Sequence, residues 1–199
     1  MGNAAIYTST LTAEEYISFE RKSIREIDGK NEFYNNQLKP MAGASPEHNY
    51  IFSNLMKILL LGLDQEQFIV FGSDMRTVSH NNQKDYFYPD LIVMTEEPQF
   101  SDAKSDILTN PSFIIEILSK STEEFDRVEK FAAYRQIPSL KELILVSQDR
   151  PCIEQFYKTS DGIWAVGETI TKIDSDFKLK TLPTVFSLKS VYHRIVFTE

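Results

Sequence analysis

The sequence predicts a three-layer α/β protein in which helices cover a central mixed β-sheet. Three segments, at residues 91–94, 113–118 and 143–146, are almost entirely apolar, which is typical of strands buried on both faces. Segments with helical spacing of apolar residues alternate with strand-like segments along the first part of the chain. With 199 residues the chain can bury a full core, so we expect one domain, with its core at about 11–146 and a β-rich tail at 147–199.

Capping residues mark the expected helices. Thr12 and Glu15 form a capping box before the first helix, and Ser121 with Glu124 has the same form before the third. Ser45 followed by a proline is typical of a helix start, and Pro138 ends the third helix. The expected helices are residues 13–22, 46–61, 121–137 and a short terminal helix within 185–197.

The strand-like segments alternate with these helices in the first part of the chain and dominate the tail. Pro89 is placed at a strand start, where the missing N–H is tolerated. The expected strands are residues 32–41, with a bend at 35–36; 68–78, interrupted at 72–74; 86–94; 113–118; 143–146; 152–158; 163–171; and shorter pieces as far as Leu182. Residues 96–110 are polar and predict a surface connection.

The charge of the chain limits the classes of partner. The net charge is −8, from 29 acidic and 21 basic residues, which by itself argues against nucleic-acid binding. However, Lys120, Arg127, Lys130 and Arg135 gather in or beside one predicted helix. A local basic rim on an acidic protein is therefore compatible with the sequence.

Targeting features point to the cytoplasm. No apolar run is long enough to span a bilayer, and residues 1–16 lack the basic and apolar regions of a secretory signal. Cys152 is the single cysteine, which excludes an internal disulfide and a cysteine-rich zinc site. We expect no membrane partner.

Two carboxylates in apolar strands are the candidate centre of chemistry. Glu116 lies within the strand 113–118, and Asp90 directly precedes the apolar run 91–94. A buried carboxylate is costly unless a cation, a metal or hydrogen-bond donors compensate it. Glu116 therefore has either a structural partner or a functional one. If the two strands are neighbours, the carboxylates repel each other unless a positive charge lies between them or one holds a proton.

A divalent cation would suit such a pair of carboxylates. Mg²⁺ and Mn²⁺ take carboxylate oxygens, backbone carbonyls and water, and the carbonyl of Ile117 would lie beside Glu116. Sites of this kind activate a water and neutralise charge on a phosphoryl group. A nearby basic residue orients the water or stabilises the transition state, and the candidates for that role are Lys120 and Lys130.

Several motifs together carry a resemblance to a known family. Tyr88-Pro89-Asp90, the segment 115–119 and the segment 126–130 followed by Tyr134 resemble the PD-(D/E)XK nuclease core. More closely, the chain resembles the Uma-type restriction endonuclease family, long described as a domain of unknown function. Further motifs that fit this family are Glu32-Phe33, residues 41–45 with His48, residues 73–76 and residues 134–140. The resemblance covers roughly residues 11–146 and implies a restriction-endonuclease-like three-layer core.

The resemblance also implies roles for individual residues. Asp90 and Glu116 would be metal ligands, and Glu32 would be a further acidic member of the site. The position two residues after Glu116, where the superfamily usually has lysine, is Leu118. In the Uma-type branch the lysine has moved to the following helix, where this chain has Lys130. His48, Lys120 and Arg127 are possible substrate contacts, although His48 could equally pack or cap its helix.

The main functional prediction is a Mg²⁺- or Mn²⁺-dependent endonuclease that hydrolyses phosphodiester bonds in nucleic acid, with DNA as the expected substrate. A first alternative is a catalytically degenerate nuclease fold that serves as a binding or toxin-neutralising module. A second is a structural homo-oligomer with an interface formed by aromatic residues of the tail, such as Phe156, Tyr157 and Trp164. A homodimer would be compatible with each of these functions.

Overall fold

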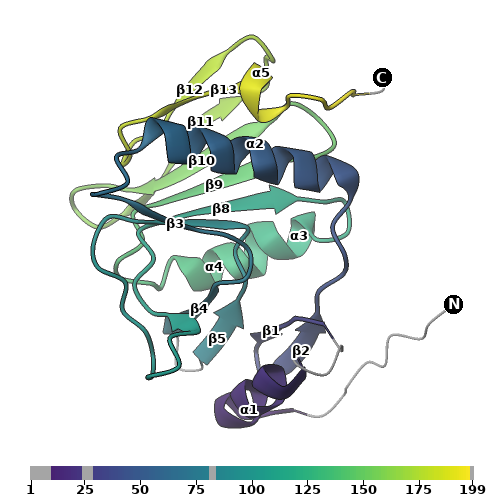
Figure 1. Ribbon diagram of the computed structural model, residues 1–199, viewed down its shortest axis with the longest axis vertical. Helices are drawn as coiled ribbons and strands as arrows, with labels where there is room; N and C mark the ends of the chain where they lie inside the picture. The colour runs from purple at the N-terminus through teal and green to yellow at the C-terminus, as the bar shows by residue number, and fades with distance from the viewer. Residues whose placement is uncertain (1–9, 24–28, 81–83, 198–199) are drawn as a thin grey trace, which may run out of the picture.

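The computed structural model describes residues 10–23, 29–80 and 84–197. Its strands form three sheets; α1 to α4 lie against the two larger ones, and α5 lies beside β13 of the smallest (Figure 1). The largest sheet has six strands in the order β11-β10-β9-β8-β6-β3. Only β8 and β9 run parallel in it, so it is a mixed sheet, as predicted. Its strands are β3 (Ile69–Phe71), β6 (Leu91–Met94), β8 (Phe113–Leu118), β9 (Glu142–Ser147), β10 (Ile153–Lys158) and β11 (Trp164–Ile170).

The second sheet has five strands in the order β2-β1-β5-β4-β7, and a third has two strands, β12 and β13. These strands are β1 (Asn31–Tyr34), β2 (Gln37–Pro40), β4 (Arg76–His80), β5 (Lys84–Phe87), β7 (Ile107–Leu108), β12 (Asp176–Lys178) and β13 (Val185–Ser187). The β10 and β11 strands of the tail extend the six-stranded sheet beyond β9. The tail thus continues the sheet that contains Glu116.

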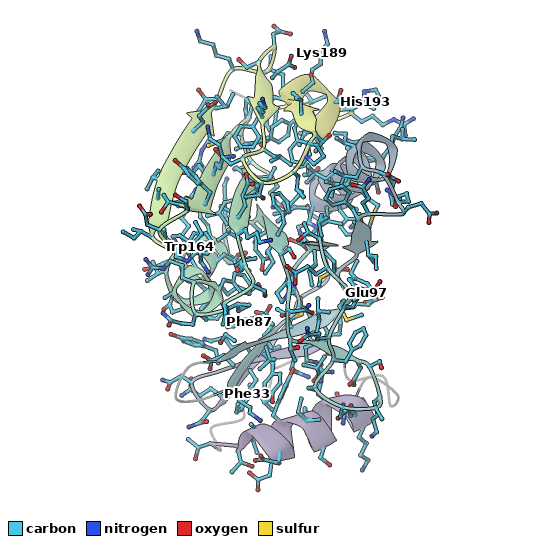
Figure 2. The ribbon with its side chains drawn as sticks, turned by 90° about the vertical axis from the view of Figure 1, so that its left-hand side faces the viewer. Phe33, Phe87, Glu97, Trp164, Lys189 and His193 are labelled. Carbon is cyan, nitrogen blue, oxygen red and sulfur yellow. The ribbon has the colours of Figure 1, made fainter. Side chains whose placement is uncertain are left out.

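Helices cover both large sheets. In the six-stranded sheet, α2 lies on one face and the helical segment α3–α4 lies on the other (Figure 1). The α1 helix packs on the five-stranded sheet, with Phe33 close to it; Lys189 and His193 lie at the opposite end of the molecule (Figure 2). The helices are α1 (Ala13–Ser23), α2 (Pro46–Gly62), α3 (Glu123–Phe125), α4 (Phe131–Tyr134) and α5 (Leu188–Val191), with a π-helical turn at Asp126–Lys130 between α3 and α4. Within the described ranges, no helix has the length and apolar character needed to cross a bilayer.

Alternation along β8 decides which layer each of its side chains enters. Phe113, Ile115 and Ile117 pack in the cluster on the α2 side, while Ile114 and Leu118 pack in the cluster that contains α4. All six residues of β8 are buried, as expected for a strand covered on both faces. Glu116 belongs to the same set as Ile114 and Leu118. Its carboxylate therefore enters the layer between the sheet and the α3–α4 segment.

Two of the expected strands each contribute to both sheets, which differs from the prediction. The expected strand 68–78 forms β3 in the large sheet and β4 in the second sheet, and the expected strand 86–94 is divided between β5 and β6. Pro89 lies at the second division and has no N–H to donate to a ladder, so the strand is interrupted there. The chain thus passes between the sheets directly before Asp90, and this places Asp90 at their junction.

The expected bent strand 32–41 is a β-hairpin. Asn35 and Asn36 both have positive φ, 51° and 62°, and form the two-residue connection between β1 and β2. Two consecutive residues with positive φ are the signature of a type I′ turn, which asparagine tolerates better than most residues. Two further short elements differ from the prediction: β7 lies within the expected surface connection 96–110, and β13 precedes the short terminal helix α5.

The tail aromatics named in the homo-oligomer alternative are partly buried within the molecule. Phe156 and Trp164 both contact Phe131 of α4, with ring centroids 4.5 and 5.9 Å apart. The indole N–H of Trp164 also donates to the backbone carbonyl of Arg135. These contacts give the aromatic side chains an intramolecular role, and Tyr157 is also only partly exposed.

Candidate active site

Asp90 and Glu116 occupy opposite positions where β6 pairs with β8. These strands are antiparallel, with Leu91 opposite Ile115, so the next position outward brings Asp90 opposite Glu116. The Asp90 carboxylate lies against the end of β8, where its Oδ2 accepts a hydrogen bond of 2.7 Å from the backbone N–H of Ile117. The predicted pairing of the two strands is thus confirmed, and the register places Asp90 and Glu116 at opposite positions of the two strands.

Glu116 is only 4% exposed and is held by two donors from the helical segment. The Tyr134 hydroxyl donates to Oε1 over 2.5 Å, and the Lys130 ammonium lies 3.1 Å from the same oxygen. The Tyr134 ring is buried and meets Phe87 edge to face, with centroids 5.3 Å apart. The buried carboxylate therefore has hydrogen-bond compensation within the protein.

Lys130 is the central cation of the site. It is 4% exposed, and its Nζ lies 2.9 Å from Glu32 Oε1, 3.1 Å from Glu116 Oε1 and 3.3 Å from Asp126 Oδ1. Asp126 precedes Lys130 by one turn in the π-helical segment, and Phe131 donates its N–H to the Asp126 carbonyl there. Three carboxylates from β1, β8 and the helical segment thus surround one ammonium.

Glu32 reaches the site from the five-stranded sheet. It lies on β1, where Phe33 points to α1, so the side chain of Glu32 points to the opposite face. Its Oε1 also accepts a hydrogen bond of 3.2 Å from the backbone N–H of Tyr88, two residues before Asp90. The segment that joins β5 to β6 therefore holds the Glu32 carboxylate beside Lys130.

His48 approaches Asp90 from the first turn of α2. Its Nε2 lies 3.2 Å from Asp90 Oδ1, and the Ser45 hydroxyl caps this helix by accepting the His48 backbone N–H. The N-terminal end of a helix carries partial positive charge, which favours carboxylates and other anions. The N-terminal end of α2 thus forms one side of the site, next to Asp90.

The electrostatics of the buried groups follow from burial and from their mutual charges. Burial raises the pKa of Glu116 well above its usual value, and Asp90, Asp126 and Glu32 add to this while Lys130 opposes it. Burial would lower the pKa of Lys130, but Glu116 and the other carboxylates outweigh that effect and raise it well above its usual value. Lys130 is therefore an ammonium at neutral pH.

The donor set is compatible with a hard divalent cation. The Lys130 ammonium contacts the carboxylates of Glu32, Glu116 and Asp126, and the His48 imidazole contacts that of Asp90, so acidic groups outnumber basic ones in this region. Across the described ranges, no three His, Cys, Asp or Glu side chains are grouped closely enough to hold a metal ion by themselves. Mg²⁺ sites commonly use only one or two carboxylates together with water and substrate phosphate. Asp90 and Glu116 meet this requirement.

Two other basic candidates lie away from this cluster. Lys120 is exposed in the turn after β8. Arg127 lies 2.8 Å from Glu123 and 2.5 Å from Glu154 of β10, so its guanidinium is held between two carboxylates. Lys130 is thus the basic residue that the fold brings to Glu116.

Two residues of the site were not among the candidates for catalysis or metal binding. Asp126 contacts Lys130, and the Tyr134 hydroxyl donates to Glu116. Both lie four residues from Lys130, one on each side, so helical spacing places all three side chains on one face. This spacing was the signal in the sequence that could have identified them.

Comparison with known proteins places the chain in a family. Residues 13–188 match the model of the Uma2 family, described as "Putative restriction endonuclease". The chain belongs to the Uma2 family. The resemblance found in the sequence motifs is thereby confirmed, and the family match extends through the tail as far as α5.

Similar proteins occur in cyanobacteria. The protein sll1609 of Synechocystis sp. is 40% identical over 161 residues, covering 81% of this chain and 88% of that protein. A second Synechocystis protein, slr1290, is 32% identical over 189 residues and covers 94% of both chains. The crystal structure of a "putative nuclease belonging to DUF820" from Anabaena variabilis shares the fold, with a TM-score of 0.73 at 14% identity, over 92% of this chain and 97% of that one. The mixed α/β nuclease-like fold is thus confirmed.

Proposed function

We propose that this protein is a divalent-metal-dependent endonuclease that hydrolyses phosphodiester bonds in DNA. The observation that carries the proposal is the opposed pair of Asp90 and Glu116, with the Lys130 ammonium 3.1 Å from Glu116. Two carboxylates and one lysine are the chemical groups that the PD-(D/E)XK pattern requires. Membership of the Uma2 family supports the same reaction class.

Asp90, Glu116 and the Ile117 carbonyl would hold the cation. The N–H and C=O of one strand residue point toward the same neighbouring strand, and the Ile117 N–H donates to Asp90. The Ile117 carbonyl is therefore expected on the Asp90 side of β8. A bound Mg²⁺ or Mn²⁺ supplies a more acidic water and neutralises charge on the phosphate.

Lys130 would orient the attacking water and stabilise charge on the phosphate. Leu118, at the usual lysine position, is 1% exposed and packs in the cluster beneath α4, so it is a core residue. Lys130 reaches Glu116 from the helical segment that covers the same face of the sheet. An ammonium supplied from the helix can therefore replace one supplied by the strand.

His48 and Lys120 are the proposed substrate contacts. His48 lies beside Asp90 at the N-terminal end of α2, where the partial positive charge of the helix favours phosphate. Lys120 is exposed in the turn between β8 and α3, close in the chain to Glu116. Phosphate recognition would thus depend on a few local positive groups, which is compatible with the net charge of −8. Arg127 is a weaker candidate because Glu123 and Glu154 already neutralise it.

Plasmid cleavage tests this proposal. The purified protein is incubated with supercoiled plasmid in Mg²⁺, in Mn²⁺ and in EDTA, and nicked and linear products are quantified. We expect cleavage only with a divalent cation and its loss in Asp90→Asn and Glu116→Gln, whereas exposed Asp161→Asn is a charge-matched control that should cleave normally. Cleavage by the Asp90 and Glu116 variants at the wild-type rate would refute the assignment. RNA and single-stranded DNA in the same assay define the substrate.

The degenerate-nuclease alternative also has an observation in its favour. Lys130 and Tyr134 already compensate Glu116, so the cluster is stable in the absence of a cation. A protein of this kind would bind a partner without cleaving it. Calorimetric titration with Mn²⁺ separates the two functions, because the alternative predicts no binding that depends on Asp90 and Glu116.

A further inference from the structure

Asp126 is a buried acid that contacts Lys130 but has no place in the proposed metal site. It is 5% exposed, and its Oδ1 lies 3.3 Å from Lys130 Nζ. The π-helical turn that contains both residues interrupts α3 and α4, and such turns are often found at functional sites. An extra buried carboxylate is costly, so this position needs a reason beyond packing.

A divalent cation and the Lys130 ammonium would compete for the Glu116 carboxylate. Among the described contacts, those of Lys130 and Tyr134 both involve Oε1 of Glu116. A divalent cation on this carboxylate would repel the ammonium 3.1 Å away. The ammonium must then be held by other groups if it is to remain in the site.

We propose that Asp126 is a positioning residue that, with Glu32, retains the Lys130 ammonium when a divalent cation binds Glu116. This inference rests on the proposed function. Glu32 and Asp126 lie 2.9 and 3.3 Å from Nζ, so two carboxylates remain on Lys130 after its contact with Glu116 weakens. Lys130 thereby stays beside the cation and does not compete with it for Glu116.

Asp126 and Glu32 hold Lys130 from two separate elements. Glu32 comes from β1 and is itself held by the Tyr88 backbone N–H, whereas Asp126 lies on the same helical segment as the lysine. The Lys130 ammonium is thus held by Glu32 from the sheet and by Asp126 from its own helical segment. Loss of Asp126 would leave Lys130 shared between Glu32 and Glu116, and Glu116 would then bind a cation less well.

Calorimetric titration with Mn²⁺ tests this role without relying on activity. Asp126→Asn keeps the side-chain shape and removes the charge, and we expect Mn²⁺ affinity to fall on the order of tenfold. Glu124→Gln is the matched control, because Glu124 is exposed on the same segment and loses the same charge. The control measures the through-space effect of the charge alone and should change Mn²⁺ affinity much less.

A double-mutant cycle shows whether Asp126 acts through Lys130. In a Lys130→Gln background, Asp126→Asn should lower Mn²⁺ affinity no more than Glu124→Gln does, because no ammonium is left to position. An equal effect of Asp126→Asn in both backgrounds would overturn the proposal. It would indicate that Asp126 binds Mn²⁺ directly or attracts it only through its negative charge. Asp126→Glu keeps the carboxylate and should retain most of the Mn²⁺ affinity even if Asp126→Asn lowers the melting temperature.

Steady-state cleavage provides a second readout. We expect Asp126→Asn to lower kcat with little change in KM, since Lys130 rather than the substrate contacts is displaced. Unchanged kcat together with a lower melting temperature would overturn the proposal in favour of a structural role. If the wild-type protein bound no Mn²⁺ at all, both the proposed function and the positioning role of Asp126 would be refuted. If the wild-type protein bound Mn²⁺ but the effect of Asp126→Asn did not depend on Lys130, only the positioning role would be overturned.

Discussion

The hydrogen bond from Tyr134 to Glu116 should make a measurable contribution to stability. Tyr134→Phe removes the hydroxyl that donates to Glu116 over 2.5 Å and retains the ring that packs against Phe87. A hydrogen bond to a charged group contributes about 1.5–3 kcal/mol to folding. Because burial already raises the pKa of Glu116, this residue can take a proton when the donor is lost, which limits the cost. We therefore expect a loss of about 1.5–2 kcal/mol in the free energy of unfolding.

Urea denaturation followed by circular dichroism measures this loss. For a chain of this length, each kcal/mol also corresponds to roughly 2–4 °C in melting temperature. Tyr157→Phe is the matched control, because Tyr157 is partly exposed and its hydroxyl has no hydrogen bond among the described contacts. A Tyr134→Phe protein as stable as the wild type would refute the view that Glu116 depends on this donor.

Two further predictions test the packing of the tail and of the core. Gly167→Ala places a Cβ 2.4 Å from Gln155 Oε1, and the Gln155 amide cannot move away freely because it donates to Glu142. We therefore expect the free energy of unfolding, measured by urea denaturation, to fall by about 1–3 kcal/mol. Gly43→Ala is the control, because its Cβ meets no atom within 4 Å and the change should be nearly neutral. Equal stability of the two variants would contradict this packing. Burial raises the pKa of the Cys152 thiol, so iodoacetamide should modify it far more slowly in the native protein than in urea, as followed by mass spectrometry. Similar rates in the two states would show that Cys152 is accessible.

The central strand and its carboxylate could be predicted from the sequence because their signals are local. The apolar run around Glu116 predicts a strand buried on both faces, and alternation along it predicts which side chains share a face. The apolar run after Asp90 predicts a second buried strand, and the structure pairs it directly with the first. These two segments were sufficient to predict that Asp90 and Glu116 lie on neighbouring strands.

The division of two predicted strands between the two larger sheets could not be predicted in the same way. Residues 86–94 have continuous strand-like character, and only the interruption at Pro89 indicates that β5 and β6 part there. Which sheet each half joins depends on pairing with strands distant in the chain, such as β1 and β8. The sequence pattern contains no information about those partners. The position of Glu32 beside Lys130 depends on the pairing of β1 with β5, which local spacing does not predict.

Asp126 was overlooked for a different reason. A charged residue at the start of an amphipathic helix is usually exposed, and the neighbouring Glu123 and Glu124 have the acidic character typical of a first helical turn. Only the tertiary position of Lys130 makes Asp126 a buried partner. Its i, i+4 spacing to Lys130 is informative once the lysine is known to point into the site.

Anomalous diffraction from crystals soaked in Mn²⁺ tests the central claim most directly. We predict a single strong anomalous peak that marks a Mn²⁺ ion coordinated by carboxylate oxygens of both Asp90 and Glu116. The Lys130 ammonium should still contact Asp126 and Glu32. Absence of manganese between the two carboxylates, with Lys130 unchanged on Glu116 at saturating Mn²⁺, would contradict the proposal that these residues form a nuclease metal site.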